Sequence, residues 1–176
     1  IAAVGYEMYC QLLEQAVLQL REGKKPALVE AMVDLGASGV IPNAYIASMG
    51  RRLVMYCRFA SCETMHAVQQ IVRDMETGYG DLPAGVKRLV QYHELRVSAS
   101  MLQIGSMIID DEDVVIRTKD SKKLALKLQR SRGTLRPVGV PSATGFTALY
   151  FRSEHLDEFA SKAEEMHSYL VESSCL

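Results

Sequence analysis

The spacing of the apolar residues changes near residue 104, and this change limits the possible folds more than any other feature of the sequence. Before it, apolar side chains recur every three or four positions, which is typical of amphipathic helices. After it, two apolar, largely β-branched runs, Met107–Ile109 and Val114–Ile116, flank four consecutive acidic residues. Such runs around a polar turn predict an antiparallel hairpin. A chain that joins long helices to this hairpin is expected to form an α+β domain.

Helical spacing predicts most of the other elements. Helices are expected over residues 1–21, 50–60, 62–77, 83–102 and 121–131, and a last one follows Ser153 and extends to Leu170. Ser61 and Ser153 are the expected N-caps of the helix 62–77 and of the last helix, because a hydroxyl can accept a hydrogen bond from a free backbone N–H. The short connection between residues 62–77 and 83–102 predicts an antiparallel helical hairpin.

Strands are expected on both sides of the helical region. Residues 28–35 alternate apolar and acidic side chains, and residues 146–151 are rich in aromatic and apolar side chains. Residues 132–145 are rich in Gly, Pro, Ser and Thr and are expected to form a loop. The expected fold class is therefore α+β, with a helical hairpin and further helices packed on a small, mostly antiparallel sheet.

Composition limits the function classes. Hydrophobic residues make up 48% and charged residues 23% of the chain, as in ordinary globular domains. The net charge of −1 gives no overall support for nucleic-acid binding. No apolar run approaches the roughly 20 residues that span a bilayer. Four scattered cysteines and no secretory signal predict a cytoplasmic protein with reduced thiols and no membrane partner.

Metal ligands are not indicated by any spacing. Cys57, Cys62 and His66 include no close cysteine pair and no evident fourth ligand. The acidic run 110–113 lacks the alternating oxygen ligands and the glycine of a calcium loop, so a solvated hairpin turn is expected. We therefore expect no metal site.

Catalytic and nucleotide motifs are not indicated either. Gly78, Gly80 and Gly85 are not followed by the Lys-Ser/Thr of a phosphate loop. The histidines 93, 155 and 167 have no nucleophile or carboxylate at a catalytic motif spacing. An enzyme with a cofactor is thus the least favoured class, and this chain is expected to have no catalytic residue.

The strongest local charge feature lies in residues 117–136, where eight basic residues are opposed only by Asp120. Two interpretations remain open. One is a contact with nucleic acid or an acidic protein surface, for which the candidate residues are Lys122, Lys123, Lys127 and Arg130. The other is a solvated basic helix with Leu124 and Leu128 inward, which the lack of interleaved aromatic residues favours.

Several short strings in the first half share the order and spacing of one protein family. They are Ile1–Tyr9, Ile41-Pro42-x-x-Tyr45-Ile46, Arg52-Leu53, Tyr56, Arg58-x-Ala60-Ser61, Tyr79-Gly80-x-Leu82-Pro83 and Glu94-Leu95-Arg96. Over residues 1–104 the chain resembles the C-terminal domain of the bacterial transcription-repair coupling factors. Asn43 and Ala44 depart from the paired acids of that family.

This resemblance implies a regulatory role without chemistry. Members of the family are ATP-dependent DNA translocases that displace stalled RNA polymerase and recruit the excision-repair protein UvrA. By resemblance, residues 1–22 are a helix that links to a translocase motor, and residues 23–176 are the C-terminal regulatory domain. That domain packs over a UvrA-binding module of the same factor and masks it. UvrA, RNA polymerase and DNA are then reached only through the rest of the factor.

The resemblance also implies a contact site late in the second helix of the region. Acidic residues of the family face the masked module there, and Asp74 occupies one such position. The next matching position is Thr77, so that contact is either lost or shifted to Glu76. A carboxylate at this place suits an arginine partner, because guanidinium and carboxylate form a planar, two-pronged pair. Nucleic-acid contact through residues 117–136 is the alternative function.

Overall fold

The computed structural model describes residues 29–36, 39–129, 131–138, 142–154 and 159–172. These residues belong to two compact units, the first with residues 39–93 and the second with residues 29–36 and 94–172. Helix α4 (Ala84–Met101) contributes its first residues to the first unit and its remainder to the second. The expected helix 1–22, and with it the boundary between residues 1–22 and 23–176, lies outside the described residues.

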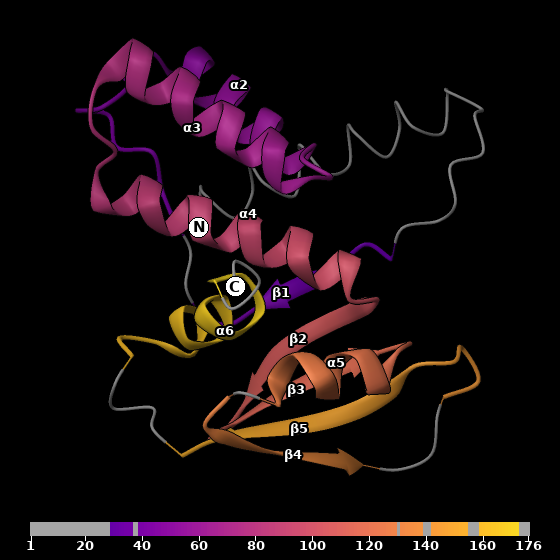
Figure 1. Cartoon of the computed structure of the whole chain (residues 1–176). Coiled ribbons are helices and arrows are strands. Elements are labelled where there is room, and N and C mark those ends of the chain that lie inside the picture. The colour runs from indigo at the N-terminus through magenta and orange to yellow at the C-terminus, as the bar shows by residue number, and fades with distance from the viewer. Residues whose placement is uncertain (1–28, 37–38, 130, 139–141, 155–158, 173–176) are drawn as a thin grey trace, which may run out of the picture. The chain divides into compact units, whose positions relative to one another are not determined.

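The first unit is helical. Helix α2 (Met49–Ala60) packs on α3 (Met65–Tyr79), and Figure 1 shows α3 and the start of α4 running in opposite directions on either side of residues 80–83. This is the helical hairpin that the sequence predicts. The interior of the unit is filled by apolar side chains that are almost fully buried, among them Ile46, Phe59, Val68, Ile71, Met75 and Val86.

The predicted cap of α3 was wrong. Helix α3 begins after Thr64, whose hydroxyl accepts a hydrogen bond from the Ala67 N–H at 3.2 Å. Ser61 instead ends α2, because its N–H donates to the Cys57 carbonyl at 3.0 Å. A serine near a helix boundary can cap the start of one helix or follow the end of another, and the sequence pattern did not separate these roles.

The second unit contains a five-stranded sheet. Its strands are β1 (Met32–Asp34), β2 (Ile104–Asp110), β3 (Asp113–Thr118), β4 (Gly133–Val138) and β5 (Thr147–Ser153), in the spatial order β1-β2-β3-β5-β4. Strand β1 pairs with β2 in parallel, and the other pairs are antiparallel. The acidic hairpin is confirmed, and Asp111 takes a positive φ of 50° in its turn. Strand β1 is shorter than predicted, but Ala31, Val33 and Leu35 are buried as expected.

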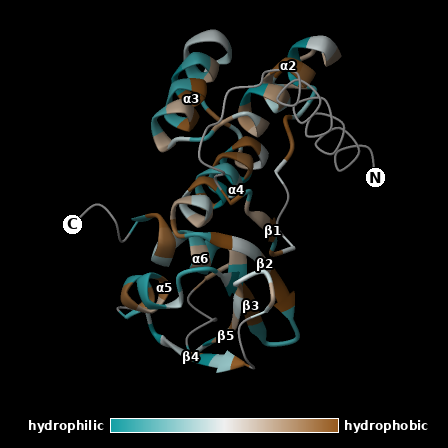
Figure 2. Cartoon of the chain, turned by 90° about the vertical axis from the view of Figure 1, so that its right-hand side faces the viewer, coloured by the Kyte–Doolittle hydropathy of each residue, from teal (hydrophilic) through white to brown (hydrophobic). Residues whose placement is uncertain are grey.

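Two helices cover one face of this sheet. Figure 2 shows α5 (Ser121–Leu128) and α6 (Lys162–Leu170) on the same side of the strands. Leu124 and Leu128 of α5 point inward as predicted. The buried face of the sheet is apolar, because Val33, Met107, Ile116 and Leu149 are aligned across four strands. The α+β fold class is therefore confirmed.

The predicted loop 132–145 was partly wrong, since its first residues form β4. Pro137 is tolerated because β4 is the outermost strand and pairs only with β5. Gly133 is required by its neighbours: a Cβ there would lie 2.5 Å from the Phe151 ring. The composition that predicted a loop therefore reflects an edge strand that is held by partners distant in sequence.

The start of the last helix was also predicted wrongly. Ser153 is the final residue of β5, and α6 begins after Ser161, whose hydroxyl accepts from the Glu164 N–H at 3.2 Å. Within the described part of the chain, no helix has the length and apolar character needed to cross a membrane.

Candidate protein-interaction site

Asp74 lies on the surface of the first unit, on helix α3. Arg58 of α2 forms an ion pair with its Oδ2, and the Gln70 amide donates to its Oδ1 at 3.0 Å. The two charged side chains are 37% and 38% exposed, so the carboxylate does not point into the apolar interior. The hydrogen bond from Arg58, followed by that from Gln70, lowers the pKa of Asp74 below its ordinary value. The group is therefore a surface carboxylate that stays ionised.

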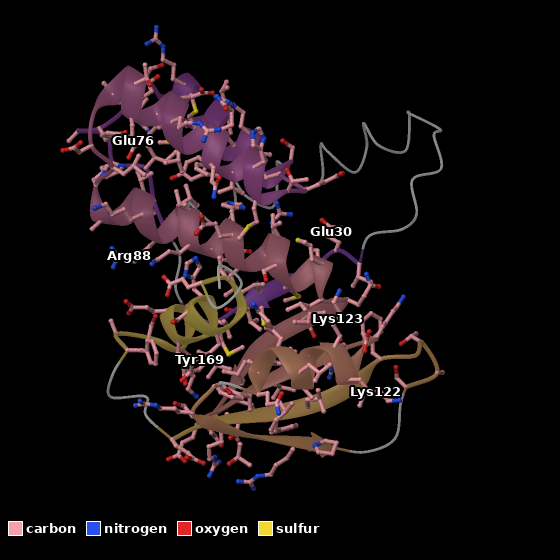
Figure 3. All side chains as sticks on the ribbon, viewed as in Figure 1. Glu30, Glu76, Arg88, Lys122, Lys123 and Tyr169 are labelled. Carbon is pink, nitrogen blue, oxygen red and sulfur yellow. The ribbon has the colours of Figure 1, made fainter. Side chains whose placement is uncertain are left out.

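The three candidate residues of α3 do not share one face of the helix. Asp74 and Thr77 are three positions apart and lie on the same side, whereas Glu76 is two positions from Asp74 and projects to the other side. Glu76, labelled in Figure 3, instead acts on Tyr45. Burial, and after it the negative charge of Glu76, raises the pKa of the Tyr45 hydroxyl. The structure thus brings Asp74 and Thr77 together and separates Glu76 from them.

Several residues of the short strings that resemble the family stabilise the fold, and Tyr45 is one of them. The Tyr45 hydroxyl donates to the Gly80 carbonyl at 2.8 Å and lies 3.2 Å from the Met75 carbonyl. It therefore satisfies carbonyl groups at the end of α3, where Gly80 takes a φ of 83°. Tyr45 has a structural role in this arrangement and fixes the end of the helix that carries Asp74.

A second group of these residues holds the loop before α2. The Ile41 N–H donates to the Tyr56 hydroxyl at 2.7 Å. The Arg52 guanidinium donates to the carbonyls of Ile46 at 2.7 Å and Ala47 at 3.0 Å. These bonds satisfy backbone groups of an irregular segment, which explains why the chain needs Tyr and Arg at this spacing.

The basic candidates lie in or next to α5 but do not form one open stripe. The Lys123 ammonium donates to the Met101 carbonyl at 2.9 Å, so it joins α5 to the end of α4. Lys122 is exposed, and Lys127 is half-buried. Figure 3 labels Lys122 and Lys123 near the start of α5. Arg130 lies outside the described residues. Nucleic-acid contact by these residues stays a prediction, and the engagement of Lys123 within the fold does not favour it.

A histidine–carboxylate pair was not predicted. The Nε2 of His167 on α6 lies 2.7 Å from Oε2 of Glu94 on α4, and its Nδ1 lies 3.6 Å from Oε1 of Glu172. The Ser98 hydroxyl donates to the Leu170 carbonyl at 2.8 Å and joins the same two helices. His167 and Glu94 are 73 positions apart, so no local pattern could reveal the pair. Within the residues described, no group of three or more His, Cys, Asp or Glu side chains could hold a metal ion.

These observations define the class of protein: an α+β domain in which a helical unit accompanies a five-stranded sheet that is covered on one face. The chain belongs to the transcription-repair coupling factor (TRCF) domain family, because the model of that domain matches residues 35–128. The transcription-repair-coupling factor of Staphylococcus aureus (strain USA300) is 31% identical over 167 residues, which are 89% of this chain and 14% of that protein. The factor of Helicobacter pylori (strain 26695) is 31% identical over 127 residues, covering 72% of this chain and 13% of that protein.

A solved structure shares the fold. The crystal structure of the C-terminal domain of a transcription-repair coupling factor superposes with a TM-score of 0.62 at 12% sequence identity. The match covers 80% of this chain and 89% of that one. This chain therefore has the fold of the C-terminal domain of the family, and it spans about one seventh or less of the length of the relatives it matches.

Proposed function

We propose that this chain is the autoinhibitory regulatory domain of a transcription-repair coupling factor. The parent protein is an ATP-dependent DNA translocase that displaces stalled RNA polymerase and recruits UvrA in transcription-coupled nucleotide excision repair. This domain has no catalytic step of its own. It covers the UvrA-binding module of the same factor until the factor is engaged. Family membership, and relatives roughly seven times longer than this chain, support the proposal.

The ionised, half-exposed carboxylate of Asp74 is the observation on which this function depends. Each of its oxygens already accepts one hydrogen bond, from Arg58 and from Gln70. A carboxylate has about four acceptor positions, so an arginine of the module can approach without displacing either donor. Thr77 lies on the same side of α3 and offers a hydroxyl at the edge of the proposed contact surface. A few polar contacts of this kind give a coupling that is weak enough to be released.

Charge reversal tests this site. The chain is titrated against the purified UvrA-binding module of its own factor, and binding is measured by calorimetry at low and at high salt. Asp74→Arg is expected to weaken binding by roughly tenfold or more at low salt, because it places a positive charge opposite the arginine partner. The wild-type affinity is expected to fall as salt is raised.

The matched control is Glu76→Arg, which makes the same charge change on the same helix but on its other side. It is expected to leave the affinity within about twofold. Asp74→Asn, which keeps the shape of the side chain, is expected to give an intermediate loss. Equal losses for the variants at 74 and 76, or an affinity that does not depend on salt, would contradict the assigned surface. Circular dichroism of each variant checks that the helices are retained.

The alternative function, nucleic-acid contact through residues 117–136, makes an opposite prediction. DNA affinity would be measurable at low ionic strength and would fall steeply as salt is added, because bound counterions are released. A fluorescence-anisotropy titration without binding at low salt removes this alternative.

A further inference from the structure

Within the second unit, α5 and α6 leave the outer face of the sheet uncovered. Helices α5 and α6 lie on the other side of the strands (Figure 2). Met32 of β1 is 61% exposed and Val138 of β4 is 47% exposed, and these two residues lie at opposite edges of this outer face. In its middle, Ile108 and Tyr150 are half-buried and Val115 is only 5% exposed, whereas Asp34 and Arg136 at its edges are exposed.

The strand register aligns the outer side chains in rows. Residues that are directly opposite one another on paired strands point to the same face. One row crosses all five strands in the order Asp34, Ile108, Val115, Tyr150 and Arg136. It begins with an acid, ends with a base and is apolar or aromatic between them.

The neighbouring row has a related pattern. It crosses the sheet in the order Met32, Ser106, Arg117, Ala148 and Val138, so an exposed apolar side chain stands at each end. The row on the other side crosses four strands in the order Asp110, Asp113, Arg152 and Thr134. Outside the central strand, acids therefore lie on β1 and β2 and basic side chains lie on β5 and β4. The central strand β3 carries one charge of each sign, Asp113 and Arg117.

This arrangement is complementary to itself. A twofold axis parallel to β3, in the plane between two facing sheets, places the β1 edge of one copy on the β4 edge of the other. Asp34 then faces Arg136 of the second copy, and Met32 faces its Val138. Ile108 faces Tyr150 of the second copy, and Val115 faces its own counterpart. The other possible in-plane axis, perpendicular to the strands, would place acid on acid.

We propose that two copies of this chain associate through their outer sheet faces as a twofold dimer, with Asp34 of each copy paired to Arg136 of the other. The arrangement is that of two sheets stacked face to face, about 10 Å apart. Its interface is isologous, as is usual for dimers of identical chains.

The same geometry limits the strength of the dimer. Five strands about 4.8 Å apart and about six residues long make a face of roughly 20 Å by 20 Å, or about 400 Å². This area is about half of the 800 Å² per partner that a typical stable interface buries. Asp113 and Arg117 of β3 both lie on the axis, and each faces its own copy, which is repulsive. Arg152 is already held by Asp113, with N–O distances of 2.8 and 3.0 Å, so it contributes less to the second copy. A weak dimer is expected.

The test is a charge-swap cycle followed by sedimentation velocity, with the 176-residue chain from about 5 µM to about 500 µM. Wild-type chain is expected to pass from monomer to dimer in this range. Asp34→Arg alone and Arg136→Glu alone are each expected to raise the dissociation constant at least tenfold. An equimolar mixture of these two variants is expected to form a heterodimer, because both intermolecular contacts are then of opposite charge. The double variant is expected to dimerise with itself again.

Lys122→Glu is the matched control, since it makes the same charge change as Arg136→Glu on an exposed residue of α5, on the other side of the sheet. It is expected to leave the dissociation constant unchanged. Arg117→Gln is expected to tighten the dimer at least threefold by removing one of the repulsions on the axis.

Three results would overturn the proposal. The first is a wild-type chain that stays monomeric at the highest concentration. The second is a dimer that neither single variant weakens, which would place the contact on another surface. The third is a mixture of the two variants that remains monomeric, which would show that positions 34 and 136 do not meet. Unchanged circular dichroism of the exposed-site variants separates these results from misfolding.

Discussion

At the scale of single residues, Glu165 shows how burial can change the pKa of a side chain. Glu165 lies in the first turn of α6, where a glutamate is ordinarily solvated and interacts favourably with the helix dipole. Here only 1% of the residue is exposed. Burial raises the pKa of its carboxyl, while the nearby Ser153 hydroxyl and the charge of Lys162 act in the opposite direction. The residue type predicts a surface position, and the packing of α6 within the second unit overrides it.

Replacing Glu165 by Gln is expected to stabilise the fold at neutral pH by about 1 kcal/mol, the usual size of a desolvation cost. In the unfolded chain the carboxyl titrates near pH 4.3, and in the folded chain it titrates higher. The folded state therefore holds the proton to higher pH. The free energy of unfolding falls as pH rises from the pKa of the unfolded chain to the pKa of the folded chain. The gain from Glu165→Gln should be present at pH 7 and absent below about pH 4.

Urea unfolding of both proteins at pH 7 and at pH 3.5 measures this difference. Glu30→Gln, at an exposed position, serves as the control and should have little effect at either pH. A loss of stability in Glu165→Gln at neutral pH would mean that the ionised carboxylate contributes to folding.

Elements were predictable where the signal was local. The helical periodicity located α2 to α5, and the acidic turn located the β2–β3 hairpin, because these patterns depend on neighbours within a few positions. Strand β4 was missed, since Gly133 and Pro137 lower local strand propensity and only pairing with β5 overrides it. The candidate site stays a prediction: the resemblance indicated Asp74, and local spacing could not indicate its Arg58 partner, which is 16 positions away on another helix.

Contact between elements also explains one glycine that local patterns assign only to a loop. A Cβ on Gly39 would lie 2.1 Å from the Leu89 backbone nitrogen of α4, a clash that no side-chain movement relieves. Gly39→Ala is therefore expected to destabilise the first unit by about 3 kcal/mol or to prevent its folding. Gly78→Ala, near the end of α3, meets nothing within 4 Å and is expected to stabilise by about 0.5–1 kcal/mol.

Thermal unfolding followed by circular dichroism measures both glycine variants against the wild type. The two changes add the same methyl group, so opposite signs would show that the close approach to α4 decides the outcome. If Gly39→Ala is neutral, the loop does not lie against α4 as described.

At the scale of the whole molecule, the two proposed associations use different compact units. Asp74 belongs to the first unit, and the outer sheet face belongs to the second. Charged residues that share no partner act independently, so their effects are expected to separate. Asp74→Arg should weaken binding to the UvrA-binding module and leave the dimer dissociation constant within about twofold. Arg136→Glu should do the reverse.

The independence of the two associations is measured on the same two variants, by calorimetry against the module and by sedimentation of the chain alone. Each variant serves as the folding control of the other, because each must retain one association. If a single substitution abolishes both, the two surfaces are coupled through the fold, and binding of the module must then change the oligomeric state. If Arg136→Glu weakens module binding while Asp74→Arg does not, the module docks on the sheet, and α3 has no part in covering it.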